Sequence, residues 1–187
     1  METHTHICPL WVGKLLLLPV RKLFNNPEKI LGPHVKPGMK VVDFGCALGY
    51  FTLPMARKVG TTGAVYAVDI QKNMIDSLSR RISKAHLDHI IHPVLITEKT
   101  DFAELAGKID FVLLFYMVHE VPDQTALMHT VSKMLKPGGK ALVVEPKGHV
   151  TAADFKSTVD IAGTSGLKPI SDLPISGSLE VLLEKQA

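Results

Sequence analysis

Two patterns of apolar and polar positions alternate along the chain after residue 38. Short apolar runs, such as Phe111–Phe115, are typical of buried strands, and longer stretches with apolar residues three and four apart are typical of helices. We predict strands over Lys40–Phe44, Ala64–Val68, Ile90–Ile96, Ile109–Phe115 and Lys140–Glu145, and helices over Tyr50–Val59, Lys72–Ala85, Phe102–Leu105, Asp123–Leu135 and Ala152–Gly163. This alternation predicts an α/β fold in which a parallel sheet carries helices on both faces.

The end of the chain departs from the alternation. Two further strand-like segments, Leu167–Leu173 and Ser178–Leu183, are separated only by Pro174–Gly177. A link this short is too small for the crossover that joins parallel strands, which takes a dozen or more residues. We therefore expect the last two strands to pair antiparallel.

The beginning of the chain reads as a separate extension. We divide the sequence into an N-terminal helical extension over residues 1–38 and a main domain over residues 39–187. A helix is expected over Leu10–Phe24, followed by a short one that Asn26 caps and Pro27 begins. Apolar residues of this extension, Trp11, Leu15, Leu18 and Phe24, would form a lid over the site, or else pack on the outer face of the sheet or on a second subunit of a homodimer.

Composition and charge restrict the partners and the cellular compartment to be expected for this protein. The net charge of +3 is too small and too evenly spread to indicate nucleic-acid binding. The most apolar segment, Leu10–Val20, contains Lys14 and Pro19 and is shorter than the roughly 20 residues that a membrane span needs. The two cysteines, Cys8 and Cys46, favour a reducing, cytoplasmic setting, because a disulfide at Cys46 would obstruct a ligand in the loop around it. We expect neither nucleic acid nor membrane as a partner.

A loop of small residues follows the first strand and predicts a ligand site. Its small residues are Gly45, Ala47 and Gly49, whereas a dinucleotide-binding loop would place its third glycine where Tyr50 stands. Asp69 directly follows the second predicted strand, 24 residues after Gly45. An acidic side chain there can accept both hydroxyls of a ribose, although it could also merely cap the following helix. The loop of small residues and the acidic residue Asp69 together favour a ligand that contains a nucleoside but is not a dinucleotide.

Four segments in order carry a family resemblance. They are VVDFGCALGYFT from Val41, VYAVDI from Val65, IDFVLLFYMVHEVPD from Ile109 and MLKPGGKALVVEP from Met134. The chain resembles the class I S-adenosylmethionine-dependent methyltransferases, in particular the methyltransferase type 11 or UbiE-like small-molecule group. The resemblance implies a doubly wound Rossmann-like sheet of seven strands in the order 3-2-1-4-5-7-6, with strand 7 antiparallel and S-adenosylmethionine as the cofactor.

The resemblance also implies which residues bind the cofactor. Asp69 would bind the ribose, Ile70 the adenine face and Glu98 the adenine edge, for which Asp101 is an alternative. The methionine part would lie against Phe115 and against the loop residues Asp43, Gly45, Cys46, Ala47 and Gly49. Ala47 departs from the family pattern, which usually has glycine there; a methyl group is often tolerated at this position, although it could crowd the amino-acid end of the cofactor.

Candidate catalytic residues follow the fourth strand. His119 and Glu120 lie where an acceptor would bind, and a histidine is suited to taking a proton from it, unless it only orders the loop. Tyr116 would position the acceptor or pack against its neighbours. The Asn-Pro-Pro-Tyr or Asp-Pro-Pro-Tyr signature of nucleic-acid base methylation and the Asp-Asn pair of a metal-dependent catechol-type site are both missing, which favours a small-molecule acceptor. Two histidine-rich sets, one of His4, His6 and Cys8 and one of His86, His89 and His92, are interpreted as surface residues, and no metal site is expected.

Two alternative functions compete with methyl transfer to a small molecule. One is a protein that binds S-adenosylmethionine without turnover, which the alanine at position 47 and the absence of a diagnostic catalytic signature keep open. The other is a nucleotide-dependent oxidoreductase. The response of thermal stability to S-adenosylhomocysteine and to a reduced nicotinamide separates the oxidoreductase from a methyltransferase, because a ligand of the native state raises its stability.

Overall fold

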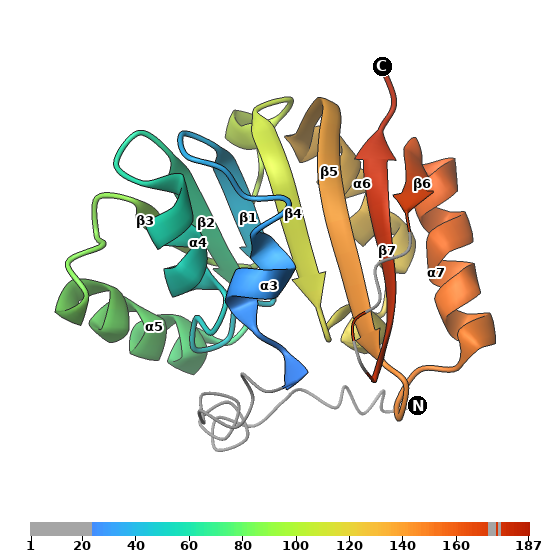
Figure 1. Ribbon diagram of the computed structural model, residues 1–187, viewed down its shortest axis with the longest axis horizontal. Helices are drawn as coiled ribbons and strands as arrows, with labels where there is room; N and C mark the ends of the chain where they lie inside the picture. Colours follow the sequence, from blue (N-terminus) through green and yellow to red (C-terminus); the bar gives the residue numbers. More distant parts are fainter. Residues whose placement is uncertain (1–23, 172–174, 176) are drawn as a thin grey trace.

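The computed structural model describes residues 24–171, 175 and 177–187. Seven strands form one sheet in the order β3-β2-β1-β4-β5-β7-β6, as predicted, and Figure 1 shows them side by side. The strands are β1 Lys40–Phe44, β2 Ala64–Asp69, β3 Ile91–Leu95, β4 Ile109–Phe115, β5 Leu135–Pro146, β6 Leu167–Ser171 and β7 Ser178–Lys185. The first five pair in parallel, and β7 runs antiparallel to both β5 and β6. The predicted fold class is confirmed.

Helices cover both faces of the sheet. They are α3 Pro27–Leu31, α4 Thr52–Val59, α5 Lys72–Lys84, α6 Gln124–Met134 and α7 Ala152–Thr164, with single 3₁₀ turns η1 Ala103–Leu105 and η2 Val118–Glu120. Apolar residues of α3, α4 and α5 pack into one core on one face, and those of α6 and α7 pack into a second core on the other. In Figure 1, α3 lies in front of the sheet and α6 behind it. The buried sheet separates the two cores, as expected for parallel strands covered on both sides.

Several predicted boundaries needed correction. The fifth strand begins at Leu135 and not at Lys140, because a bulge sets Ile109 opposite Leu135 but Phe111 opposite Lys140. Gly138 adopts a positive φ of 74° within this bulge, which a residue without a side chain tolerates. The turn η2 was not predicted. Asn26 caps α3 as expected, since its side chain accepts a hydrogen bond from the Glu28 N–H at 2.9 Å.

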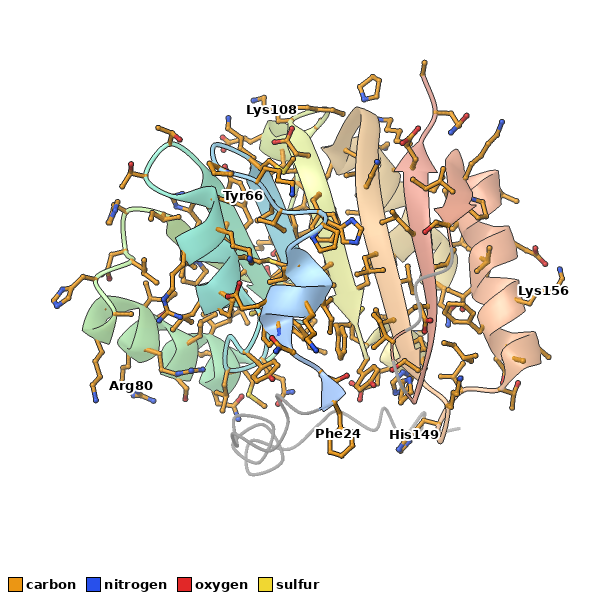
Figure 2. The ribbon with its side chains drawn as sticks, viewed as in Figure 1. Phe24, Tyr66, Arg80, Lys108, His149 and Lys156 are labelled. Carbon is orange, nitrogen blue, oxygen red and sulfur yellow. The ribbon has the colours of Figure 1, made fainter. Side chains whose placement is uncertain are left out.

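Part of the N-terminal prediction lies outside the described residues. This applies to Trp11, Leu15 and Leu18 of the suggested lid and to the set of His4, His6 and Cys8. Phe24 is described and is exposed, and Figure 2 places it with His149 at the edge of the molecule to which the parallel strands point, whereas Lys108 lies at the opposite edge. None of the helices in the described ranges has the length and apolar character that crossing a bilayer requires.

Candidate functional site

A cavity of about 540 Å³ opens at the carboxyl ends of the parallel strands. Ligands of open α/β sheets bind at this edge, where the direction of winding reverses. The cavity is bounded by the loop after β1, the ends of β2 and β4, and the start of α6. Its walls include Asp43, Gly45, Cys46, Ala47, Tyr50, Phe51, Asp69, Ile70, Ile96, Phe102, Phe115, Tyr116, Met117, Glu120 and Thr130.

The loop after β1 is held against the end of β2 by backbone hydrogen bonds. The N–H groups of Gly45 and Cys46 both donate to the Val68 carbonyl, at 2.8 and 3.0 Å. Gly45 has a φ of 77°, and a β-carbon built there would lie 3.0 Å from the Met117 side chain. Glycine is therefore needed at this position for both its backbone angle and its close approach to the cavity wall.

Asp69 connects this loop to the next helix. One of its carboxylate oxygens accepts the Ala47 N–H at 2.9 Å, and the other accepts the Gln71 N–H at 2.8 Å. Burial raises the pKa of the Asp69 carboxyl, and these backbone N–H groups oppose the rise. Each carboxylate oxygen has two acceptor positions, so both can still bind a hydroxyl from the cavity. Asp69 does not cap α5, whose N-cap is Gln71, but holds the turn before that helix while still facing the cavity.

Asp43 provides a second carboxylate in the cavity wall. Its side chain is only 3% exposed and accepts a hydrogen bond from the Thr52 hydroxyl at 2.5 Å. Thr52 is the first residue of α4 and is itself buried. A buried carboxylate is costly without hydrogen bonds, and this contact with Thr52 supplies one. The strand β1 and the helix α4 thus fix the carboxylate at the bottom of the loop.

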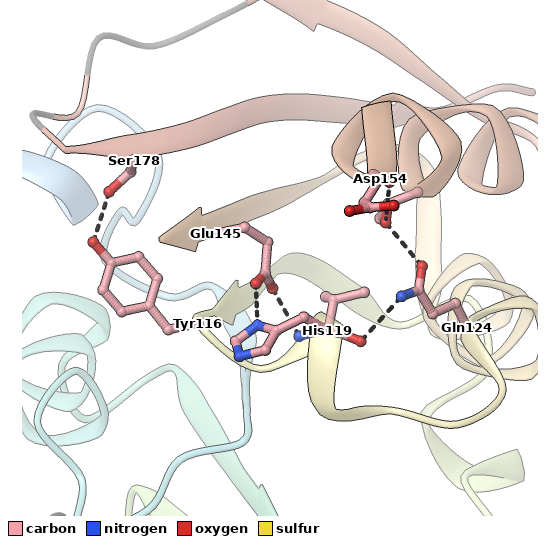
Figure 3. Close-up of polar contacts among 8 residues, drawn as sticks. Tyr116, His119, Gln124, Glu145, Asp154 and Ser178 are labelled. Carbon is pink, nitrogen blue, oxygen red and sulfur yellow. Dashed lines mark hydrogen bonds and ion pairs between the residues drawn. The ribbon is translucent and has the colours of Figure 1, made fainter. Parts of the chain in front are cut away.

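Aromatic rings form one side of the cavity. The ring of Phe115 lies 4.5 Å from that of Phe51 and 4.3 Å from that of Tyr116, measured between centroids. The Tyr116 hydroxyl lies 2.6 Å from the Ser178 hydroxyl at the start of β7, as Figure 3 shows. Tyr116 has a φ of 59°, a left-handed conformation that is rare for an aromatic residue. Its position is therefore fixed by β7 as well as by its neighbours in the chain.

The 3₁₀ turn η2 directs three successive side chains to three different places. A turn of three residues per revolution separates consecutive side chains by about one third of a circle. Val118 is buried in the core, His119 pairs through Nδ1 with a carboxylate oxygen of Glu145, and Glu120 lines the cavity. Burial raises the pKa of the Glu120 carboxyl; nearby Glu145 and Asp69 add to the rise and the two histidines His119 and His149 oppose it. The His119–Glu145 pair was not predicted.

A family model described as a methyltransferase domain matches residues 19–169. The chain belongs to this methyltransferase family. The resemblance to class I S-adenosylmethionine-dependent methyltransferases is thereby confirmed. With the site geometry, this membership makes the cavity the candidate active site of the methyltransferase domain.

Relatives and solved structures agree with this membership. A demethylmenaquinone methyltransferase of Staphylococcus saprophyticus is 29% identical over 112 residues, which are 60% of this chain and 46% of that protein. The chain thus spans less than half the length of this relative. A SAM-dependent methyltransferase of Aquifex aeolicus shares the fold with a TM-score of 0.83 at 20% identity, covering 95% of this chain and 99% of that one. A putative S-adenosyl-L-methionine-dependent methyltransferase of Methanococcus maripaludis gives 0.78 at 14% identity, covering 100% and 98%.

Most residues that the sequence suggested for this methyltransferase site lie together in the cavity wall. The lining includes Asp43, Gly45, Cys46, Ala47, Asp69, Ile70, Phe115, Tyr116 and Glu120. Ile70 lines the cavity although it is 55% exposed. Cys46 is free and buried in the wall, and burial raises the pKa of its thiol well above its usual value.

Three suggested residues lie outside the lining. Gly49 packs against α5, where an added β-carbon would lie 2.4 Å from Leu78 Cδ1. Glu98 is exposed in the turn after β3. His119 lies beside the cavity, with its side chain 25% exposed.

The histidines His86, His89 and His92 are exposed, and in the part of the chain that the structure describes no three His, Cys, Asp or Glu side chains form a group suited to a metal ion.

Ala47 has a φ of 44°, which explains why glycine is usual at this position of the methyltransferase loop. A left-handed backbone costs a residue with a β-carbon about 1–2 kcal/mol, part of which the greater flexibility of glycine in the unfolded chain offsets. We expect Ala47→Gly to raise the free energy of unfolding by about 0.5–1 kcal/mol. Urea denaturation measures the change. Ala141→Gly, in the middle of β5, is the control and should destabilise the protein.

Proposed function

We propose that this protein transfers a methyl group from S-adenosylmethionine to a small-molecule acceptor. The observation that carries the proposal is the placement of two buried carboxylates, Asp43 and Asp69, in the wall of one largely apolar cavity beside a glycine-containing loop. Asp69 offers two oxygens to the hydroxyls of a ribose, and Ile70 offers an apolar surface to a base. Asp43 lies under the loop, where a positively charged amino group would be neutralised. The residues present fit the cofactor.

The protein's own tasks in this reaction are alignment and the exclusion of water. When bound, the cofactor supplies an electrophilic methyl group on a positively charged sulfur. Its transfer is an in-line displacement, which depends on how the acceptor is held. Phe115 and Tyr116 form the rigid wall next to the loop, and Glu120 and His119 follow on η2. We assign acceptor binding and proton transfer to Tyr116, His119 and Glu120.

The acceptor we propose is small and largely apolar. The support comes from the apolar lining, from the absence of a nucleic-acid methylation signature in the sequence and from the similarity to a demethylmenaquinone methyltransferase. Reduced quinones and phenols therefore come first in a panel of acceptors. We place the reaction in the cytoplasm, in agreement with the free thiol of Cys46, and propose no nucleic-acid or membrane partner.

Binding and turnover test the proposal separately. Titration calorimetry should detect binding of S-adenosylmethionine and S-adenosylhomocysteine, and both should raise the melting temperature, whereas NADH should do neither. Release of S-adenosylhomocysteine in the presence of each acceptor then measures methyl transfer. Binding without release across the panel would favour a non-catalytic cofactor-binding protein, and stabilisation by NADH alone would favour an oxidoreductase.

The N-terminal extension has two proposed roles, a lid over the site or a contact in a homodimer. Removal of residues 1–23 tests both, because this segment precedes the first described helix α3. Loss of turnover with an unchanged molar mass in light scattering would support the lid. A change from dimer to monomer would support the subunit contact.

A further inference from the structure

Glu145 is a buried carboxylate near the candidate site, and the proposed function assigns it no task. It lies near the end of β5 and is only 1% exposed. One oxygen accepts the Val118 N–H at 2.8 Å, and the other contacts Nδ1 of His119. Burial raises the pKa of the Glu145 carboxyl, and the nearby His119 and the backbone N–H groups oppose the rise. The carboxylate is thus divided between a backbone donor and one nitrogen of an imidazole.

The backbone that carries His119 is fixed from both sides. The Val118 N–H is bound by Glu145, and the Val118 carbonyl accepts a hydrogen bond from the Gln124 side chain at 3.3 Å. Gln124 is in turn held by the Thr158 hydroxyl, which donates to its Oε1 at 2.8 Å, so that α6 and α7 both support η2. Figure 3 shows this chain of contacts and shows the second ring nitrogen of His119 pointing away from Glu145. The ring therefore has one defined orientation.

We propose that Glu145 is a positioning residue for methyl transfer, holding a proton on Nδ1 of His119 so that Nε2 is free to act as the base. The proposal rests on the proposed function, since it assigns His119 a role in that reaction. A neutral imidazole carries one proton, and a carboxylate facing Nδ1 can only accept, so the proton stays on Nδ1. Met117 and Glu120 line the cavity, the His119 side chain between them in the chain is 25% exposed, and the proposal assigns its Nε2 to the acceptor.

Methyl transfer would be accompanied by the movement of one proton from the acceptor to His119. His119 Nε2 takes the proton of the acceptor's reacting group as the electron pair of that group forms the bond to the methyl carbon. The electron pair of the broken carbon–sulfur bond stays with sulfur, which loses its positive charge. His119 gains that charge as an imidazolium, and the adjacent Glu145 carboxylate stabilises it. Glu145 itself exchanges no atom with the acceptor.

Glu145→Gln is the substitution that tests this role, because glutamine has a single side-chain oxygen. That oxygen can accept the Val118 N–H, and the amide NH₂ then faces Nδ1 and forces the ring proton onto Nε2. We expect ¹⁵N NMR of histidine-labelled protein to show the Nδ1-protonated tautomer in the unmodified protein and the Nε2-protonated tautomer in the variant. His119→Gln identifies the signal. We also expect kcat to fall at least about tenfold, with an acceptor KM within about twofold of the original.

Glu180→Gln is the matched control. Glu180 lies on the neighbouring strand β7 opposite Val144, and its carboxylate also accepts a backbone N–H, that of Ile175 at 3.0 Å. This variant should keep both the tautomer and kcat. Affinity for S-adenosylhomocysteine should be unchanged in both variants, which also shows that both are folded.

Two results would overturn the proposal. One is an Nε2-protonated His119 in the unmodified protein, which needs no variant to be folded. The other is a Glu145→Gln protein with the kcat of the Glu180→Gln control. The tautomer is measured without acceptor or turnover. A protein with no methyltransferase activity would therefore refute the proposed function and the contribution of Glu145 to turnover, while NMR would still decide whether Glu145 fixes the ring proton.

Discussion

Replacing Asp69 with alanine is expected to weaken the binding of S-adenosylhomocysteine about 100-fold, or about 2.7 kcal/mol. Two effects add in the same direction. The ribose hydroxyls lose a charged acceptor, for which a single hydrogen bond contributes about 1.5–3 kcal/mol. The Ala47 N–H loses its partner as well, so that the loop that forms the cavity wall is held to the end of β2 by fewer hydrogen bonds. Titration calorimetry at neutral pH measures the affinity.

Asp101→Ala is the control for this substitution. Asp101 also caps a turn by accepting a backbone N–H, that of Ala103 at 2.9 Å, but it does not line the cavity. Its replacement should change the affinity less than about twofold, as expected for a surface position. An equal loss in both variants would indicate a general effect on folding and would contradict ribose binding by Asp69. Glu98→Ala should behave like the control, because Glu98 is exposed outside the cavity.

The pH dependence of binding gives the same prediction a second test. Because burial raises the pKa of Asp69, this carboxyl takes up a proton at a higher pH than an exposed aspartate. The protonated form accepts fewer hydrogen bonds from ribose, so affinity should fall as the pH is lowered through the raised pKa. In Asp69→Asn, where the side chain does not titrate, this part of the dependence should be absent. An identical pH profile in the two proteins would contradict the assignment.

The arrangement of the strands could be predicted from the sequence, whereas short irregular elements could not. The alternating apolar runs identify the parallel strands, and the short link before Ser178 requires an antiparallel last strand. By contrast, η2 is only one turn long and has no periodicity to detect. The early start of β5 depends on a bulge against β4, a tertiary contact that hydrophobic pattern alone does not reveal.

The site shows the same division between local signals and long-range contacts. Asp43, Gly45, Ala47 and Asp69 lie on two segments that a spacing pattern identifies, and the structure places all four in the cavity wall. The pairing of His119 with Glu145 joins residues that are 26 apart in the sequence and depends on the neighbouring positions of β4 and β5. The sequence contains two partial indications of the pair, because His119 follows one central strand and Glu145 lies at the end of another, both at the ligand-binding edge. Spacing alone could not assign the pair.

Spacing also treats the small residues of the loop as equivalent, although the structure separates their roles. Gly45 and Ala47 line the cavity, whereas Gly49 faces α5. A β-carbon at Gly49 would lie 2.4 Å from Leu78 Cδ1 and 3.0 Å from Leu53 Cδ1, and the φ of this residue is 79°. Gly49 therefore allows α5 to pack closely against the start of α4. Its substitution should affect stability before it affects ligand binding.

We expect Gly49→Ala to lower the free energy of unfolding by about 2–4 kcal/mol, from backbone strain and overpacking together. For a protein of this size that corresponds to a melting temperature roughly 5–12 °C lower. Gly107→Ala separates the two contributions, because Gly107 also has a positive φ, 63°, but has no atom within 4 Å of an added β-carbon. It should lose only about 1 kcal/mol. Urea denaturation of both variants measures the difference.

The steric part of this loss should depend on Leu78. Leu78→Ala removes the colliding methyl group and, because Leu78 is fully buried, is itself expected to cost about 2–5 kcal/mol. The double variant should lose about 1 kcal/mol or more less unfolding free energy than the sum of the two single losses. The reason is that the new methyl group occupies part of the space that leucine leaves. Additive losses, or a Gly49→Ala protein as stable as Gly107→Ala, would show that α5 moves away at no cost. Gly49 would then be needed only for its backbone angle.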